Sequence, residues 1–240
     1  EPQHKVKGLI TKKLLNLLGI KFCNLNQKKD LKDLSKLIDY SKKKIKIIAC
    51  LIKKNSISTN FSKNRNLKSH IKRIDFLNEL ISQIRKKTNI ISTTGYTSRE
   101  LNLLQERKNN NYINSFYMVG GMGHAGSLSL GVSIQTKSQT ICLDGDGSLI
   151  MHLGSIISNG YFAKRNFKHI LFNNRSHESV GGQSTRIDKV NFEKLSYSVG
   201  YKEYIKAKNL KEFRSKIKYF LKSKGPIFLK SLQKKDQLMT

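Results

Sequence analysis

The segment 140–148, with the sequence TICLDGDGS, constrains the fold of this 240-residue chain more than any other stretch. Its first four residues have the apolar, β-branched character of a buried strand, and the glycine turn after them leads into a helix predicted from about 148 to 163. Parallel α/β sheets bind ligands at the carboxyl ends of their strands. The segment therefore predicts such a sheet with a binding site at the turn.

Strand and helix patterns alternate along the rest of the chain. Strands that alternate with helices favour an α/β fold, in which a parallel sheet carries helices on both faces. No apolar run approaches the roughly 18 residues of a membrane-spanning helix, so we expect no membrane partner. Short apolar runs predict further strands at 45–52, 89–92, 167–172 and 226–229, and helical stripes predict helices at about 11–19, 28–40, 71–86, 99–106 and 209–223.

Composition divides the chain into three parts. Residues 1–56 are predicted to hold two helices and a strand, which resembles the end of an α/β unit. Residues 57–70 are rich in Ser, Asn and Lys and poor in apolar residues, as linkers are. Residues 71–240 contain the other predicted strands and are expected to form the main domain.

The charge of the chain is strongly basic, with 46 Lys and Arg against 16 Asp and Glu and a net charge of +30. Such a balance is typical of nucleic-acid-binding proteins, which gain affinity by releasing phosphate counterions. Only nine of these residues are Arg, however, and between Asn109 and Ala163 only Lys137 is basic. We therefore favour a solvated basic surface over a nucleic-acid partner, which remains the alternative from another class of protein.

The three cysteines, Cys23, Cys50 and Cys142, are odd in number and far apart, with no spacing typical of a metal site. This pattern predicts buried thiols in a reducing compartment, so we expect a cytoplasmic protein.

A second polar motif follows the next predicted strand. Asn173 and Asn174 end that strand, and 25 residues, the length of one helix and one strand, separate them from Gly147. We expect this spacing to bring Asp146 and Asn174 together at the ends of adjacent parallel strands. Two such oxygen ligands suit Mg²⁺, which completes its octahedral shell with water and substrate phosphates. Taken singly, Gly-Asp-Gly is also a common turn, and an Asn pair also ends ordinary strands.

These two motifs together resemble the thiamine diphosphate signature of the pyruvate decarboxylase superfamily. The flanking segments 92–100, 116–125 and 177–183 are similar to those of the phosphonopyruvate decarboxylase family. The likeness is strong from 90 to 185 and looser elsewhere. It implies a thiamine-diphosphate-binding fold whose main domain holds the diphosphate.

The resemblance implies a set of ligands for the cofactor and its metal. The side chains of Asp146 and Asn174 and the backbone carbonyl of Ser176 would bind Mg²⁺. Thiamine diphosphate would be bound by residues of the glycine-containing motifs, namely Gly95, Thr97, Gly120, Gly121, Met122, Asp146, Gly147, Ser148, Asn174 and Ser176.

The resemblance also implies individual roles. Gly120 would offer its carbonyl to the aminopyrimidine, and Met122 would be the wedge that forces the cofactor to bend. His177 and Glu178 would lie over the reacting carbons as catalytic residues that contact substrate or transfer protons. His124 is equally well explained as a histidine at the start of a helix.

Three features depart from the family pattern. Arg175 stands where a small residue or Gly is usual, and Ser184 stands where Pro is usual. The glutamate that activates the pyrimidine ring in this family lies in a preceding domain, and none of Glu79, Glu100 and Glu106 stands in a matching motif. Residues 1–56 therefore resemble the last part of that pyrimidine-binding domain, and the chain resembles the C-terminal portion of the enzyme or one half of a split pair.

The resemblance implies decarboxylation of 3-phosphonopyruvate to 2-phosphonoacetaldehyde and CO₂. The runner-up is a subunit of sulfopyruvate decarboxylase, in which a sulfonate replaces the phosphonate. The implied partners are a small anionic 2-oxo acid as substrate and either further copies of this chain or a separate pyrimidine-binding subunit.

Overall fold

The computed structural model describes residues 2–53, 56, 72–108 and 110–233. The linker predicted at 57–70 lies outside the described residues. The chain divides into two compact units, Glu1–Asn66 and Leu67–Thr240. That the first unit derives from a pyrimidine-binding domain stays a prediction.

The smaller unit is built around two parallel strands. Helix α1 (Pro2–Leu17) precedes β1 (Lys21–Leu25), and α2 (Leu31–Lys44) connects β1 to β2 (Ile48–Ile52). Cys23 and Cys50 are direct partners in the register of these strands. Both are half-buried, so the prediction of buried thiols is right only for Cys142. Strand β1 was not expected, because its polar residues Lys21 and Asn24 interrupt the short apolar run.

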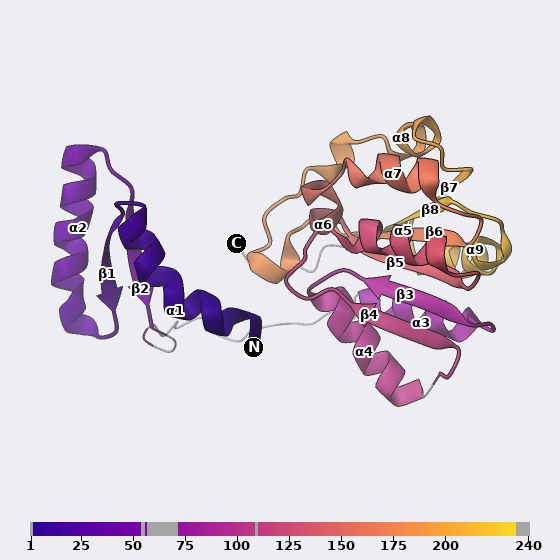
Figure 1. The fold of residues 1–240 in the computed structure, drawn as a ribbon, viewed down its shortest axis with the longest axis horizontal. Helices are drawn as coiled ribbons and strands as arrows, with labels where there is room; N and C mark the ends of the chain where they lie inside the picture. Colours follow the sequence, from indigo (N-terminus) through magenta and orange to yellow (C-terminus); the bar gives the residue numbers. More distant parts are fainter. Residues whose placement is uncertain (1, 54–55, 57–71, 109, 234–240) are drawn as a thin grey trace. The chain divides into compact units, whose positions relative to one another are not determined.

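The larger unit contains a six-stranded parallel sheet in the order β4-β3-β5-β6-β8-β7 (Figure 1). The sheet confirms the α/β prediction. Its strands are β3 (Thr88–Ser92), β4 (Ile113–Tyr117), β5 (Gln139–Gly145), β6 (Phe167–Asn173), β7 (Glu203–Ala207) and β8 (Ile227–Leu232). The helices of this unit are α3 (Arg73–Gln83), α4 (Tyr96–Lys108), α5 (Ala125–Gln135), α6 (Asp146–Met151), α7 (Ser155–Phe162), α8 (Phe192–Ser198) and α9 (Leu210–Lys222).

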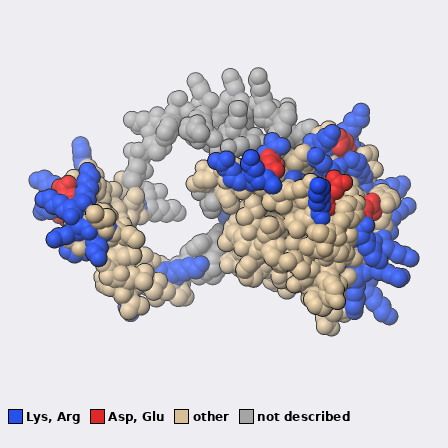
Figure 2. All heavy atoms as spheres, turned by 90° about the horizontal axis from the view of Figure 1, so that it is seen from above, with Lys and Arg blue, Asp and Glu red and all other residues tan. Residues whose placement is uncertain are grey.

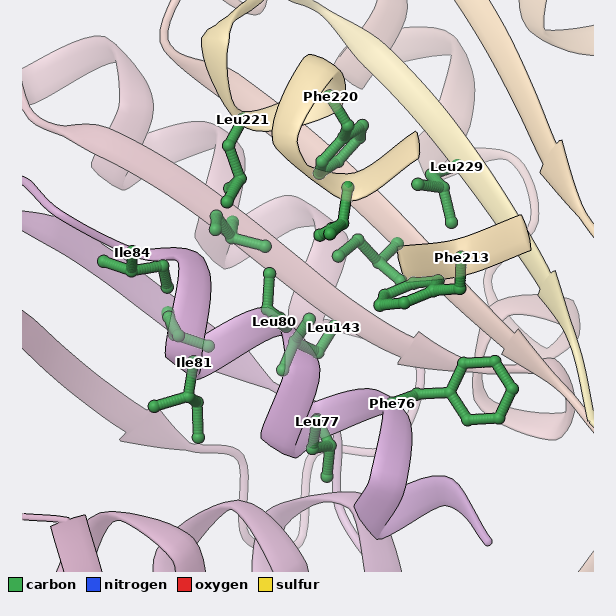
Figure 3. Close-up of a cluster of buried hydrophobic side chains, with 14 of the residues drawn as sticks. Phe76, Leu77, Leu80, Ile81, Ile84, Leu143, Phe213, Phe220, Leu221 and Leu229 are labelled. Atoms are coloured by element: carbon green, nitrogen blue, oxygen red, sulfur yellow. The ribbon is translucent and has the colours of Figure 1, made fainter. Parts of the chain in front are cut away.

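Side chains alternate along the central strands between two separate cores. On β5, Ile141 and Leu143 pack with α3, α4 and α9, whereas Cys142 packs with α5, α6 and α7 on the other face. Figure 3 shows the first core, in which Phe76 and Phe213 meet edge to face at 5.2 Å between ring centroids. Both faces of the central strands are covered, so these strands are buried along their length, including the polar residues Asp144, Lys168 and His169.

The order in which strands are added to the sheet changes side between β3 and β5, although the two strands are parallel. The connection from β3 leads outward to β4 at one edge, whereas the connection from β5 leads to β6 on the opposite side. Strands β3 and β5 are hydrogen-bonded neighbours, so their carboxyl ends diverge into helices on opposite faces. Such a switch point is where open α/β sheets bind ligands. The turn after β5, which the sequence singled out, lies at this point.

The helix predicted from about 148 to 163 is two helices, because α6 ends at Met151 and α7 begins at Ser155. His152 breaks the helix with an extended φ of −132°, and Gly154 starts the next one. Residues between the predicted elements also form β4, α5, α8 and β7, to which the sequence analysis assigned no structure.

Basic residues gather at the margins of the visible face. Figure 2 shows a broad area of the larger unit that carries neither lysine nor arginine, with blue side chains along its edges. Within the described residues, no helix is long and apolar enough to cross a membrane.

Candidate cofactor and metal site

The loops after β3, β5 and β6 converge around a pocket at the switch point. Thr93 comes from the loop after β3, Thr97 from the first turn of α4, and Arg73 from the start of α3. Nine of the residues predicted from the sequence also line the pocket: Thr97, Met122, Asp146, Gly147, Ser148, Asn174, Ser176, His177 and Glu178.

Asp146 begins α6 and its carboxylate is buried, with 4% of the residue exposed. Its Oδ2 accepts hydrogen bonds from the backbone N–H of Ser176 at 2.9 Å and from the Thr185 hydroxyl at 2.9 Å. Its Oδ1 accepts from the N–H of Gly147 at 3.0 Å. Burial raises the pKa of the Asp146 carboxyl, and these hydrogen bonds oppose the rise. The donors fix both oxygens in direction, which is what a metal ligand requires.

Asn174 lies beside Asp146, as the spacing of the two motifs predicted. The N–H of Ser176 that bonds Asp146 also donates to Oδ1 of Asn174 at 3.1 Å, so one amide joins the two side chains. Both residues and Ser176 are buried. The Asn174 amide nitrogen donates in turn to Oε2 of Glu178 at 3.1 Å. The amide group of Asn174 is thus oriented with its oxygen toward Asp146.

Ser148 joins three loops of the site. Its Oγ accepts a hydrogen bond from the Thr93 hydroxyl at 2.5 Å, after β3, and from the N–H of Gly123 at 3.0 Å, after β4. All three residues are buried. This arrangement holds the α6 start against the turn that contains Gly95, whose φ of +94° favours glycine.

Gly147 allows the close approach of His177. A Cβ on Gly147 would lie 2.5 Å from Nδ1 of His177, well inside van der Waals contact. Because Gly147 has no side chain, the imidazole of His177 can contact the backbone at the start of α6. His177 is held by two backbone hydrogen bonds, from its N–H to the Gln183 carbonyl at 2.8 Å and from the Gly182 N–H to its own carbonyl at 3.0 Å.

Glu178 is bound by a residue that the sequence analysis missed. Nη2 of Arg73 donates to Oε2 of Glu178 at 2.9 Å, and Nε of Arg73 donates to Oε2 of Glu100 at 3.2 Å. The side chain of Arg73 is 14% exposed and that of Glu178 is 12% exposed. Arg73 belongs to no local motif and lies 105 residues from Glu178, so only the fold reveals the pair. Thr185 was missed for the same reason, whereas Thr93 lies within the segment 92–100 but was assigned no role.

Three predicted residues do not line the pocket. Gly95 lies next to it, where a Cβ would be 3.7 Å from Oγ of Ser179. Gly120 is exposed in the loop after β4, and Gly121 packs against Met118, whose sulfur would be 2.7 Å from a Cβ. Their roles toward a cofactor stay predictions, as do those of the residues that line the pocket.

Two of the three departures from the family pattern, Arg175 and Ser184, lie outside the pocket. Arg175 has a φ of +62°, a conformation that favours glycine and explains the small residue usual there. Its Nε lies 2.6 Å from Oδ2 of Asp188, and both side chains are half exposed. Ser184 pairs with Ser176 in an isolated antiparallel bridge. Neither residue takes the place of an oxygen ligand.

The donor set fits a Mg²⁺–diphosphate group. Buried carboxylate and amide oxygens lie together at the start of α6, where one backbone N–H joins them. Hard oxygen ligands of this kind are the ones that Mg²⁺ prefers.

Comparison with known families agrees with this geometry. Residues 93–231 match the family described as "Thiamine pyrophosphate enzyme, C-terminal TPP binding domain", which covers more than half of the chain. The fold and site therefore define a thiamine pyrophosphate (thiamine diphosphate) enzyme domain, and the chain belongs to this family.

The relatives narrow the comparison to two kinds of decarboxylase. The chain is 34% identical over 154 residues to a protein called phosphonopyruvate decarboxylase from Streptomyces viridochromogenes, covering 64% of this chain and 38% of the relative. It is also 34% identical over 148 residues to sulfopyruvate decarboxylase subunit beta from Methanocaldococcus jannaschii, covering 61% of this chain and 76% of the relative. The matched part thus spans less than half of the first relative and about three quarters of the second.

A solved structure shares the fold. The 2-oxoglutarate:ferredoxin oxidoreductase from Magnetococcus marinus, described with 2-oxoglutarate, coenzyme A and succinyl-CoA bound, aligns with a TM-score of 0.54 and 14% identity. The alignment covers 75% of this chain and 72% of that chain. At this identity the likeness concerns the fold alone.

Proposed function

We propose that this chain provides the diphosphate-binding domain of a thiamine-diphosphate-dependent decarboxylase that acts on 3-phosphonopyruvate. The products would be 2-phosphonoacetaldehyde and CO₂. The observation that carries the proposal is the single N–H of Ser176 that joins the oxygens of Asp146 and Asn174 inside the pocket. Identity to a phosphonopyruvate decarboxylase and to a sulfopyruvate decarboxylase subunit supports the same class of reaction.

In this proposal the chain's residues first hold the metal and the cofactor. Asp146, Asn174 and the carbonyl of Ser176 would bind Mg²⁺, and Thr97, Gly147 and Ser148 would contact the diphosphate. Bound thiamine diphosphate would supply an electron-accepting ring for the carbon that loses CO₂. The buried hydrogen bonds of Asp146 fix its carboxylate before binding, so little ordering entropy is lost when the metal enters.

His177 and Glu178 are the proposed catalytic residues. Both line the pocket, and the imidazole of His177 lies over Gly147. Glu178 accepts hydrogen bonds from Arg73 and Asn174 on the same oxygen, Oε2, so this oxygen is fixed. Either side chain, once protonated from solvent, would donate that proton to the carbon that has lost CO₂. Arg73 acts as a positioning residue that holds Glu178.

Sulfopyruvate is the competing substrate. It differs from phosphonopyruvate by a sulfonate in place of the phosphonate, and the two kinds of relative are equally similar to this chain. The β-subunit relative also favours pairing of this chain with a separate pyrimidine-binding subunit, which would supply the activating glutamate. Assays of both substrates with Mg²⁺ and thiamine diphosphate, with and without such a subunit, compare the alternatives. Release of CO₂ from neither substrate under either condition would contradict the proposal.

The metal assignment is tested by Asp146→Ala. Calorimetric titration with thiamine diphosphate and Mg²⁺ should show a loss of affinity of at least about 100-fold, because the variant lacks a charged metal ligand. The matched control is Asp188→Asn, which alters a nearby, half-exposed carboxylate paired with Arg175. The control should bind as the unmodified chain does. Unchanged affinity of Asp146→Ala would refute the assignment.

A further inference from the structure

A second group of metal-binding side chains lies inside the sheet, outside the pocket. Cys142 on β5 and His169 on β6 are direct partners in the strand register, and Asp144 follows two residues after Cys142 on the same face. The exposed fractions are 0% for Cys142, 1% for Asp144 and 0% for His169. The proposed mechanism uses none of these residues.

The three side chains point their ligand atoms at one another. The thiol sulfur, a carboxylate oxygen and an imidazole nitrogen all lie within 4.8 Å of one another. Sγ of Cys142 is 3.8 Å from Oδ2 of Asp144, and Nε2 of His169 is 3.4 Å from the same oxygen. The N···O separation exceeds the usual 2.7–3.2 Å of an N–H···O hydrogen bond. Ligands around a tetrahedral zinc ion lie about 3.3–3.6 Å apart, given bond lengths of about 2.0–2.3 Å.

One carboxylate oxygen of the cluster has no hydrogen-bond partner. Within the described residues, Oδ1 of Asp144 is buried and accepts no hydrogen bond. Ser129 and Asn159 lie beside the cluster, where they interact with the thiol of Cys142 and with the hydroxyl of Tyr201. Native proteins pair nearly all such atoms. An unpartnered carboxylate oxygen in an apolar core points to a cation beside it.

His169 is oriented as metal-binding histidines usually are. The Tyr201 hydroxyl lies 2.9 Å from Nδ1 of His169, which leaves Nε2 directed at Asp144. A partner on the second ring nitrogen fixes both the tautomer and the direction of a ligating imidazole. The ring of Phe228 packs against that of His169, with 4.8 Å between the ring centroids.

We infer that Cys142, Asp144 and His169 bind a zinc-type divalent cation. The ion would link β5 to β6 in the core, outside the cofactor pocket. The thiolate, imidazole and carboxylate set suits zinc, whereas Mg²⁺ selects oxygen ligands such as those of Asp146 and Asn174. Binding of the ion through both carboxylate oxygens would also give Oδ1 of Asp144 a partner. The inference does not depend on the proposed decarboxylation.

The competing explanation is a metal-free chain of hydrogen bonds from Tyr201 through His169 to Asp144. Metal analysis of the full chain separates the two. After expression with zinc and dialysis against metal-free buffer, we expect about one zinc per chain by mass spectrometry. Less than about a tenth of an equivalent would overturn the inference in favour of the hydrogen-bonded chain.

Cobalt replacement tests the ligands themselves. The cobalt-loaded chain should show sulfur-to-cobalt charge-transfer absorption, which requires a thiolate ligand and does not depend on enzyme activity. Cys142→Ser and His169→Gln should lower metal retention at least about tenfold. The matched control, Cys50→Ser, should retain both the metal and the absorption.

Asp146→Ala separates this site from the proposed Mg²⁺ site. The variant should keep the cobalt absorption, because its ligands differ. If Asp146→Ala abolishes the absorption, or if Cys142→Ser keeps it, the inference is wrong. If the core variants fail to fold, the cobalt-loaded unmodified chain is the test. Absence of the charge-transfer absorption from that chain would also overturn the inference.

Discussion

Arg73 shows how a residue distant in sequence from the other site residues completes the site. Its guanidinium bridges Glu100 and Glu178, at 3.2 Å and 2.9 Å, and is largely buried. The planar fork makes two directed hydrogen bonds, which a lysine cannot reproduce. Glu178 would lose its charged donor in a variant with a neutral side chain at this position, although the cofactor ligands would stay in place.

We therefore expect Arg73→Gln to lower the turnover number by about 10- to 100-fold, within the range by which acid–base groups accelerate reactions. Cofactor affinity should change little, and Arg73→Lys should restore part of the rate. Steady-state kinetics with saturating cofactor measures both. The control is Arg214→Gln, which breaks a similar contact to Glu79 at 2.8 Å on the exposed side of α9. Equal effects of the two variants would show that Arg73 has no special role.

Lys168 is a buried ionisable residue of the core, with 1% of its surface exposed. Its ammonium donates to the Ser223 carbonyl and lies 5.5 Å from the ring centroid of Phe220. Burial lowers the pKa of Lys168 from 10.5 to about 8. The unfolded chain therefore binds more protons than the folded chain between these values, so this residue's contribution to stability rises with pH.

Between about pH 7.5 and 9.5, the free energy of unfolding of the unmodified chain should rise by about 2 kcal/mol relative to that of Lys168→Met. Denaturant unfolding of both proteins at several pH values measures the difference, and titration of other groups cancels in the comparison. A constant difference across this range would mean that the Lys168 pKa is not lowered.

At the level of single residues, the sequence predicted those that stand in local motifs. Asp146 and Asn174 were expected together because one helix and one strand separate them, and the parallel sheet brings their strands side by side. Arg73 and Thr185 could not be predicted, because their contacts depend on how distant segments pack. Cys142 was judged by its spacing to other cysteines, whereas its partners are a histidine and an aspartate on the sheet.

Helix α5 offers a direct test of element packing, because two of its glycines meet different surroundings. A Cβ on Gly131 would have no atom within 4 Å, but one on Gly126 would lie 2.7 Å from Nδ2 of Asn159. Asn159 is fully buried and cannot move aside freely. Gly131→Ala should raise the free energy of unfolding by about 0.5–1 kcal/mol, since alanine loses less entropy in a helix. Gly126→Ala should lower it by about 1–3 kcal/mol through overpacking.

Thermal and denaturant unfolding of the two variants give these values, with the unmodified chain as reference. Destabilisation by Gly131→Ala would indicate that a contact covers this exposed side of α5. Little effect of Gly126→Ala would mean that α5 and α7 are less closely packed than the structure indicates.

The elements that the sequence did not predict share physical reasons. β4 and β7 are the edge strands of the large sheet, so exposed positions interrupt their apolar residues. α5 is rich in Gly and Ser, which are weak helix formers, and packing of its small residues against α7 and the sheet determines its structure. Central strands buried on both faces were predicted because each contains a short apolar run, even where polar residues such as Lys168 and His169 interrupt it.

The strand order is a property of the whole molecule that no local pattern contains. The sequence predicts parallel strands, but the crossing from β4 over β3 to β5 is defined only by long-range packing. This crossing creates the switch point where the site lies. The charge of +30 is likewise spread over the molecule, and it leaves the segment from 109 to 163, which contains Met122 and the turn from Gly145 to Ser148, almost free of basic residues.

The two units differ in what holds each of them together. Residues 73–232 bury two apolar cores, one on each face of the six-stranded sheet. In contrast, no hydrophobic residue of the described part of the smaller unit is fully buried, and Leu9, Leu17, Ile45 and Ile47 are all more than 70% exposed. A two-stranded sheet without a core is marginally stable in water.

We therefore expect residues 67–240, expressed alone, to unfold cooperatively and to bind thiamine diphosphate and Mg²⁺ as the full chain does, with a melting temperature within about 4 °C of it. Residues 1–66 alone should show no cooperative transition, because their apolar side chains stay in contact with water. Calorimetry of both fragments measures this. Cooperative melting of 1–66 would mean that the smaller unit has a core of its own, and loss of cofactor binding by 67–240 would mean that the site needs residues from the smaller unit.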